Sequence, residues 1–236
     1  MPYLSKFIHM VSAASLVLVA SAPAAQAGDA ATETERLQKS VGVLRELVST
    51  PDDAIPEHIL DRAEAVVVIP TLVKGGFILG AEHGKGVMSV RDRATGRWSL
   101  PSFVQITGGS IGWQIGVQST DLVLLVMNAD GVDELLRSEF KLGANASVAA
   151  GPVGRSAEAS TDATMSAKIL AYSRSKGLFA GLSLQGAALK DDAEANGNFY
   201  GREQSAREVF AMPTTPAPEA AAAWLSALTS IAPFSR

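Results

Sequence analysis

The sequence predicts an α+β fold: a curved or barrel-like, largely antiparallel sheet with flanking helices and an amphipathic helix near the N-terminus. Three observations support this prediction. Apolar runs of strand length follow one another between residues 65 and 189 with few long helical segments between them, which favours an antiparallel or mixed sheet over a doubly wound parallel one. Glycines recur four residues apart in three segments that lie within or at the start of these runs. A segment with a helical period precedes the first run.

Residues 1–27 have the pattern of a secretory signal peptide. Lys6 is followed by an apolar stretch over residues 7–20, and Ala25 and Ala27 fit the small-residue rule for cleavage. The apolar stretch is shorter than the about 18 to 20 residues that span a bilayer, so a retained membrane anchor is the weaker interpretation. We therefore expect an exported protein, located in the periplasm and peripherally associated with a membrane.

The predicted mature chain is acidic and contains no cysteine. Removing residues 1–27 takes away one lysine and no acid, which leaves 19 basic and 24 acidic side chains and a formal charge of −5. An acidic chain lacks the basic field that phosphate backbones require, which argues against nucleic acid as a partner. We expect one domain at residues 28–210, followed by a Pro/Ala-rich C-terminal tail at residues 211–236, both held without disulfides.

The first element of the domain is an amphipathic helix over residues 32–48. Its apolar positions recur at spacings of four, three and four: Leu37, Val41, Leu44 and Val48. Thr32 or Thr34 is expected to cap its N-terminus, and Pro51 ends the pattern. The apolar stripe either packs on the domain's own sheet or inserts into a membrane interface. Mixed charge on the polar face favours packing, because interfacial helices are usually rich in Lys and Arg.

Strands are expected from residue 65 onward. The predicted runs are 65–69, 77–83, 86–91, 103–107, 111–118, 122–127, 144–149, 164–173 and 178–189. A turn at residues 94–96 closes a hairpin onto Trp98. Asp130 is expected to cap a short helix that extends to Ser138, and a brief helical segment is expected near Asp191.

The C-terminal tail contains a short helix, predicted over residues 218–229. Four residues could form its apolar side: Trp224, Leu225, Leu228 and Ile231. Two interpretations remain open for this segment. It is either a flexible tail that docks back on the domain, or a contact segment for a membrane or a partner protein. Docking is the favoured interpretation.

Three strand segments carry two glycines separated by three residues. They are Gly76–Gly80, Gly112–Gly116 and Gly177–Gly181. In a strand the two glycines of each pair share a face, so that face lacks side chains there. Glycine weakens a strand unless the sheet bends or another group approaches closely. Curvature with close packing is the favoured explanation, and a shallow groove for an acyl chain or a partner's backbone is the alternative.

Several motifs resemble those of the SYLF domain family. They are AAGPVGR at residues 149–155, YSRSKGLFAG at residues 172–181, NFYG at residues 198–201, and upstream segments at residues 65–86, 98–101 and 108–121 in the same order. The resemblance covers about residues 37–201. It implies a non-catalytic lipid-binding module, which in some eukaryotic members also binds actin. For an exported protein it implies bacterial phospholipid, or an anionic membrane surface, as the ligand.

Lipid affinity of this kind needs cationic donors for a phosphate beside apolar surface. Four residues at strand ends or turns are the candidate lipid-binding side chains: Lys74, Arg155, Arg174 and Lys176. Lys74 and Lys176 precede glycines in matching KG contexts. The ordinary alternative for each residue is a solvated or salt-bridged charge at a strand end.

The sequence offers little support for catalysis or metal binding. Only His58 and His83 remain after removal of residues 1–27, and the chain has no cysteine, HExxH or GxSxG motif. The paired carboxylates at residues 52–53 and 191–192 are expected to serve as helix caps and solvated turns. We expect no enzyme activity, cofactor or metal. The alternatives are an envelope protein-interaction module and, less favoured, a hydrolase that uses His83 as its base.

Overall fold

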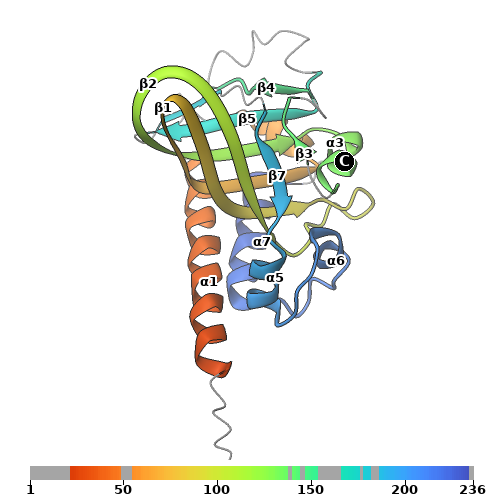
Figure 1. The fold of residues 1–236 in the computed structure, drawn as a ribbon. Helices are drawn as coiled ribbons and strands as arrows, with labels where there is room; N and C mark the ends of the chain where they lie inside the picture. Colours follow the sequence, from red (N-terminus) through yellow and green to blue (C-terminus); the bar gives the residue numbers. More distant parts are fainter. Residues whose placement is uncertain are drawn as a thin grey trace, which may run out of the picture.

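The computed structural model describes residues 22–48, 55–137, 140–143, 147–153, 166–175, 178–181 and 186–233. Within these residues seven strands form one curled sheet and six helices surround it. Figure 1 shows the two longest strands curling over at the top of the view, with α1, α5, α6 and α7 below them. The predicted α+β class with a curved, largely antiparallel sheet is confirmed.

Strands β1 (Ala65–Val90) and β2 (Ser102–Val126) form one long antiparallel ribbon. The pairing begins at Ala65 opposite Val126 and reaches Met88 opposite Ser102. The sequence pattern predicts three separate strands in place of each of these, and that division is wrong. The apparent breaks are absorbed within continuous strands, as register shifts after Ile69 and after Gly76 and as curvature.

The ribbon curls until its two ends meet. The ammonium of Lys74 lies 2.8 Å from the carboxylate of Glu82, although residues eight apart in a straight strand are separated by about 26 Å. The amide of Arg91 donates to the carbonyl of Glu64 at 2.7 Å, which joins the end of β1 to its beginning. A Cβ atom on Gly86 would stand 2.0 Å from the carbonyl oxygen of Val68. The backbone therefore packs closely where the curl closes at Gly86, a position outside the three glycine pairs.

The remaining strands extend both ends of β2. Their bounds are β3 Phe140–Lys141, β4 Val148–Ala150, β5 Ile169–Ser175, β6 Leu178–Gly181 and β7 Ala188–Asp191. The beginning of β2 pairs with β7, and its end pairs with β5. Strand β4 runs parallel to β5, whereas every other pairing among the described strands is antiparallel. The predicted run over residues 178–189 is two strands that pair with different neighbours.

Apolar side chains on the two faces of the ribbon belong to two separate cores. One core fills the inside of the curl and includes Val67, Ile69, Leu122 and Leu124. The other lies between the sheet and the helices and includes Val66, Val68, Val123 and Leu125. Burial on both faces explains why these strands are continuous apolar runs rather than alternating patterns.

Helix α1 (Ala22–Glu46) packs its apolar stripe on the domain. Leu37, Val41 and Leu44 are buried in the core that lies beneath the helices, and α1 contacts α7, β1 and α5. The favoured interpretation, packing rather than membrane insertion, holds for these three residues, whereas Val48, the fourth residue of the predicted stripe, lies beyond the end of the helix and is 48% exposed. The predicted cap is wrong, because the helix already includes Ala22 and the Thr34 hydroxyl donates to the Ala30 carbonyl within it.

The predicted C-terminal helix is α7 (Glu219–Ile231), and it docks on the domain. Trp224 and Leu228 are fully buried. The indole Nε1 of Trp224 donates to the Ser89 hydroxyl of β1 at 2.8 Å. The docking interpretation of this segment therefore holds, with its largest side chain inside the core.

Four shorter helices complete the described fold: α2 (Glu57–Arg62), α3 (Ala129–Leu135), α5 (Ala193–Tyr200) and α6 (Ala206–Phe210). Helix α3 is capped by Asn128, not by the predicted Asp130. Helix α5 is the segment expected near Asp191, and Asp192 caps it. Helices α2 and α6 are not among the predicted elements, although the capping box of Ser205 and Glu208 is a sequence signal for α6.

Candidate functional site

The structure describes two of the four predicted lipid-binding residues. Lys74 lies in β1 and Arg174 lies in β5, whereas Arg155 and Lys176 lie outside the described residues. Both described residues have carboxylate partners within the chain.

Lys74 is directed toward the inside of the curl. Its half-buried ammonium pairs with Glu82, whose carboxylate is only 8% exposed. Gly108 opposes Glu82 across the ribbon, and a Cβ at this glycine would lie 2.6 Å from the Glu82 carboxylate. The Lys74–Glu82 pair therefore connects two parts of β1 that the curl brings together. Lys74 thus forms a salt bridge within the chain, which was the alternative to lipid binding for this residue.

Arg174 connects three elements of the fold. It stands opposite Asp121 in the β2–β5 register, and its Nε donates to Asp121 Oδ2 at 2.8 Å. Its Nη1 also pairs with Glu46 at the end of α1. Asp121 in turn accepts the backbone amide of Thr71, which has a φ of 81° beside the first register shift of β1. Burial raises the pKa of Asp121 and the Thr71 hydrogen bond opposes that rise, while burial lowers the pKa of Arg174.

Lys74 and Arg174 do not converge on one face of the sheet. Lys74 is paired with Gln118 and Arg174 with Asp121. Paired residues share a face, and positions 118 and 121 of β2 point to opposite faces because side chains alternate along a strand. A single headgroup on one face of β2 would therefore reach only one of these two cations.

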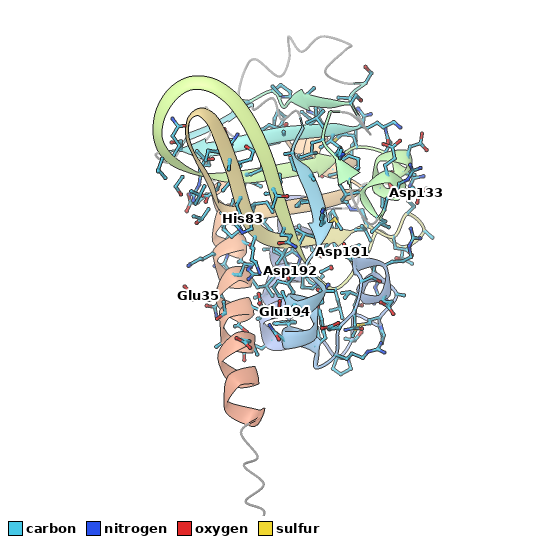
Figure 2. All side chains as sticks on the ribbon, in the orientation of Figure 1. Glu35, His83, Asp133, Asp191, Asp192 and Glu194 are labelled. Atoms are coloured by element: carbon cyan, nitrogen blue, oxygen red, sulfur yellow. The ribbon has the colours of Figure 1, made fainter. Side chains whose placement is uncertain are left out.

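The structure reveals a different cationic site, a groove between α1 and β1. This α1–β1 groove has a volume of about 360 Å³. Its basic lining residues are Arg36 and Lys39 from the helix and His83 and Lys85 from the strand. Glu35 is the carboxylate among the lining residues. Figure 2 labels Glu35 on α1 and His83 on the ribbon above it.

The floor of the α1–β1 groove is a buried network of charges. Arg36 is 11% exposed at its side chain, and its Nη1 lies 2.8 Å from Glu33 and 3.6 Å from Asp192. Lys85 reaches the same Asp192 oxygen at 2.9 Å. Burial raises the pKa of Glu33, and the neighbouring Arg36 opposes that rise. Arg36 is thus fixed in place, whereas the exposed ammonium groups of Lys39 and Lys85 can turn toward an anion at the groove.

Exposed apolar side chains stand beside this groove. Val73 lines it and is 40% exposed, and Val117 is 78% exposed. Val117 is paired with Gly75, two positions along β1 from Val73, so the two valines are diagonal neighbours on one face of the ribbon. Cationic and apolar surface therefore adjoin on the outer side of the curl.

Sequence reasoning missed the α1–β1 groove because its two walls are far apart in the chain. Arg36 and Lys39 are three residues apart on the polar face of a helix, and His83 and Lys85 are two apart in a strand. Each spacing places two basic residues on one side of its element. No local signal indicates that these two sides meet.

The two histidines and the paired carboxylates of the described residues lie apart from any metal-binding cluster. His58 and His83 are both exposed, and no group of three His, Cys, Asp or Glu residues in the described part of the chain could hold a metal ion. Asp192 caps α5 and Asp191 accepts the Ala206 amide at 2.9 Å, as expected for carboxylates at helix starts. Asp52 and Asp53 lie outside the described residues. None of the described helices is long and apolar enough to cross a bilayer.

The sequence is similar to those of known proteins of one family. Over 172 residues the chain is 40% identical to LAS seventeen-binding protein 3 of Saccharomyces cerevisiae, which covers 71% of this chain and 37% of the relative. Over 179 residues it is 33% identical to the human SH3 domain-containing YSC84-like protein 1, covering 73% of this chain and 52% of the relative. The chain therefore spans between about a third and a half of the length of these curated relatives.

The family model that matches is described as "Las17-binding protein actin regulator", and it covers residues 107–231. The match includes most of β2, all of β5 and β7, and the docked helix α7. That description names regulation of actin rather than a catalysed reaction. The resemblance seen in the sequence motifs is thereby confirmed, and the chain belongs to the Ysc84 (SYLF) family.

Proposed function

We propose that this protein is a non-catalytic module that docks on an anionic phospholipid surface, with the α1–β1 groove receiving the lipid headgroup. The observation that carries this proposal is the junction of the groove with exposed apolar side chains. Arg36, Lys39 and Lys85 line the groove, and Val73 and Val117 lie on the same side of the ribbon. Peripheral docking combines these two features, since basic groups attract anionic headgroups and apolar side chains enter the interface.

The basic residues of the groove have different roles in the proposed docking. Arg36 is held by Glu33 and supplies a fixed positive field at the floor. Lys39 and Lys85 are exposed and would contact the phosphate directly. Each would then leave its intramolecular partner, Glu35 for Lys39 and Asp192 for Lys85, and pair with the phosphate instead. The whole chain has a formal charge of −4, so this local patch has to act against repulsion at longer range. Binding should therefore be sensitive to salt.

The location of the protein and its natural ligand are also part of the proposal. We infer that residues 1–27 direct export and that the ligand is a phospholipid of the bacterial envelope. Lys74, Arg155, Arg174 and Lys176 remain proposed secondary contacts. For Lys74 and Arg174 the headgroup would compete with Glu82, Asp121 and Glu46.

Vesicle co-sedimentation tests the proposal. The protein is mixed with phosphatidylcholine vesicles, with or without anionic phosphatidylglycerol, at 20 mM and about 150 mM salt, where the screening length is about 8 Å. We expect binding to the anionic vesicles that weakens at the higher salt. The K39A/K85A variant should bind at least about tenfold more weakly, because it lacks two charge-assisted contacts.

The matched control replaces two exposed arginines that do not line the groove, Arg202 and Arg207. The R202A/R207A variant carries the same net charge as K39A/K85A and should retain binding. The proposal fails if neither vesicle type sediments the protein, or if both double variants lose binding to the same extent.

A second candidate function is protein binding, and the relatives' names favour it. LAS seventeen-binding protein 3 is named for a protein partner. This chain matches 37% of that relative, so the partner-binding region either lies within the shared part or outside it. A direct test is gel filtration of this protein with purified Las17 in the absence of lipid. Co-elution at a fixed stoichiometry would favour an interaction module, and separate elution at micromolar concentrations would argue against it.

A further inference from the structure

A second groove lies where the two ends of β1 meet. This hairpin-end groove has a volume of about 360 Å³, and its lining residues include Asp61, Arg62, Glu64, Arg91, Arg93 and Met127. They converge because the Arg91 amide donates to the Glu64 carbonyl, and the Glu64 amide donates to the Val126 carbonyl, each at 2.7 Å. No residue lines both this groove and the α1–β1 groove.

Arg91 is the buried centre of the hairpin-end groove. Its side chain donates to the backbone carbonyls of Asp61 and Ala232, each at 2.6 Å, and its guanidinium carbon lies 4.4 Å from the centre of the Trp98 ring. These contacts are made to neutral groups. The residue is only 9% exposed, and its Nε has no hydrogen-bond partner within the described residues. A buried guanidinium with an unused donor is a costly arrangement unless an anion completes it.

Two further arginines stand at the same groove. Arg62 is exposed at the end of α2, and Arg93 is exposed in the turn after β1. The Nε of Arg93 pairs with Glu64 at 2.5 Å. The carboxylates of Asp61 and Glu64 favour the charged form of Arg91 from a longer range. Three guanidinium groups and two carboxylates give the lining of this groove a formal charge of +1.

We propose that the hairpin-end groove binds a phosphate group. Arg91 supplies a buried positive charge beneath the phosphate, and Arg62 and Arg93 contact it from the sides. The planar fork of arginine matches an anion with several oxygens, and a groove that uses three arginines and no lysine fits that chemistry. The site is independent of the proposed membrane docking at the α1–β1 groove. The phosphate belongs either to a soluble compound or to a lipid headgroup, and the experiment separates these two sources.

Arg91 also has a structural role, because its two hydrogen bonds connect α2 to the end of α7. A variant at Arg91 would confuse loss of binding with loss of folding. The informative variant is therefore R62A/R93A, which changes two exposed side chains. The matched control is R97A/R202A. Arg97 belongs to the same hairpin turn as Arg93 and is also exposed, but it does not line the groove.

The experiment has two arms. Isothermal titration calorimetry with inorganic phosphate in a chloride buffer measures binding of a soluble anion. Co-sedimentation with phosphatidylcholine vesicles, with and without phosphatidic acid, measures binding of the same group on a lipid. In the arm that shows binding, we expect R62A/R93A to weaken it at least about tenfold. R97A/R202A and K39A/K85A should stay within about twofold of the wild type in the phosphate titration.

Each result decides between support and rejection. Saturable phosphate binding that R62A/R93A removes supports the site and assigns it to soluble phosphates. Binding confined to phosphatidic acid vesicles, lost in R62A/R93A and kept in R97A/R202A, supports it with a lipid source. The site is rejected if neither probe binds, if R62A/R93A binds like the wild type, or if vesicle binding depends on Lys39 and Lys85 alone. That last result would leave the membrane-docking function intact.

Discussion

The two ends of β1 meet at what we call the closed end of the ribbon, where β1 and β2 are buried on both faces. Along the curl, by contrast, the same two strands leave Val73 and Val117 exposed to solvent. The interior of the closed end is covered by helices and held by contacts such as the Trp224–Ser89 hydrogen bond, and the Arg93–Glu64 ion pair lies at its exposed rim. The outer side of the curl instead carries ion pairs and the α1–β1 groove. This difference indicates that the buried interior of the closed end provides stability, whereas the outer side of the curl offers the surface for the proposed membrane docking.

The closed end should be the more sensitive of the two regions, and Trp224→Ala should have the largest effect. This change removes a fully buried indole and leaves a cavity between α7 and the sheet, so we expect a loss of about 3 to 5 kcal/mol in the free energy of unfolding. Urea denaturation measures the loss. Trp224→Phe keeps most of the ring and should cost less, because it mainly removes the hydrogen bond to Ser89. A loss below about 1 kcal/mol for Trp224→Ala would show that α7 is not part of the core.

Gly86→Ala should be the next most damaging change at the closed end. The added Cβ would stand 2.0 Å from the Val68 carbonyl, a backbone atom that cannot rotate away, so we expect a loss of about 1 to 3 kcal/mol. Gly42→Ala is the control. It lies in α1 with no atom within 4 Å of the new Cβ, and it should raise stability by about 0.5 to 1 kcal/mol. Thermal unfolding of both variants would contradict the account if the two midpoints shifted in the same direction.

The paired glycines of the strands show how much of the fold can be predicted from the sequence alone. The spacing of paired glycines predicted curvature, and the continuous apolar runs predicted strands buried in a sheet. The length of β1 and β2 could not be predicted in this way, because the residues that look like turns at the breaks between runs are accommodated by long-range pairing with the other strand. The same limit applies to Lys74, whose partner Glu82 becomes a neighbour only through the curl.

The binding region is harder to predict than the fold for a related reason. The four candidate cations were chosen from local contexts such as the KG sequences, which carry no information about their partners. Arg36 and Lys85 form one site only after α1 packs along β1, and that contact depends on the apolar stripe around Leu37 and Val41. Helix patterns indicate which face is buried, but they do not identify the strand that covers it.

A smaller effect is expected from the charge network beneath the α1–β1 groove, and it depends on pH. Burial holds the pKa of Glu33 above its ordinary value of 4.5, so the folded state binds this proton more tightly than the unfolded state does. Stability from this group is fully present below the unfolded pKa and is lost as the pH rises through the folded pKa. Glu33→Gln should therefore gain stability relative to the wild type as the pH rises above 4.5, measured by urea denaturation between pH 4 and 7.

Glu35 provides the control for this pH dependence. It lies on the exposed side of the same helix, and the hydrogen bond from Lys39 lowers its pKa. Glu35→Gln should therefore show the opposite sign and at lower pH: the wild type gains stability over the variant as the pH rises toward 4.5, and the difference stays constant above that value. Identical pH profiles for the two variants would show that burial of the network does not control the titration.

In the proposed docking the outer side of the curl faces the lipid surface, and a single fluorescent label can report this contact. The chain contains no cysteine, so Val117→Cys and Arg202→Cys each provide one labelling position for an environment-sensitive dye. With anionic vesicles at low salt, the account predicts a blue shift and quenching by lipid-attached quenchers for the label at position 117, and neither for the label at position 202. Sedimentation with the vesicles while the label at position 117 stays in water would contradict it.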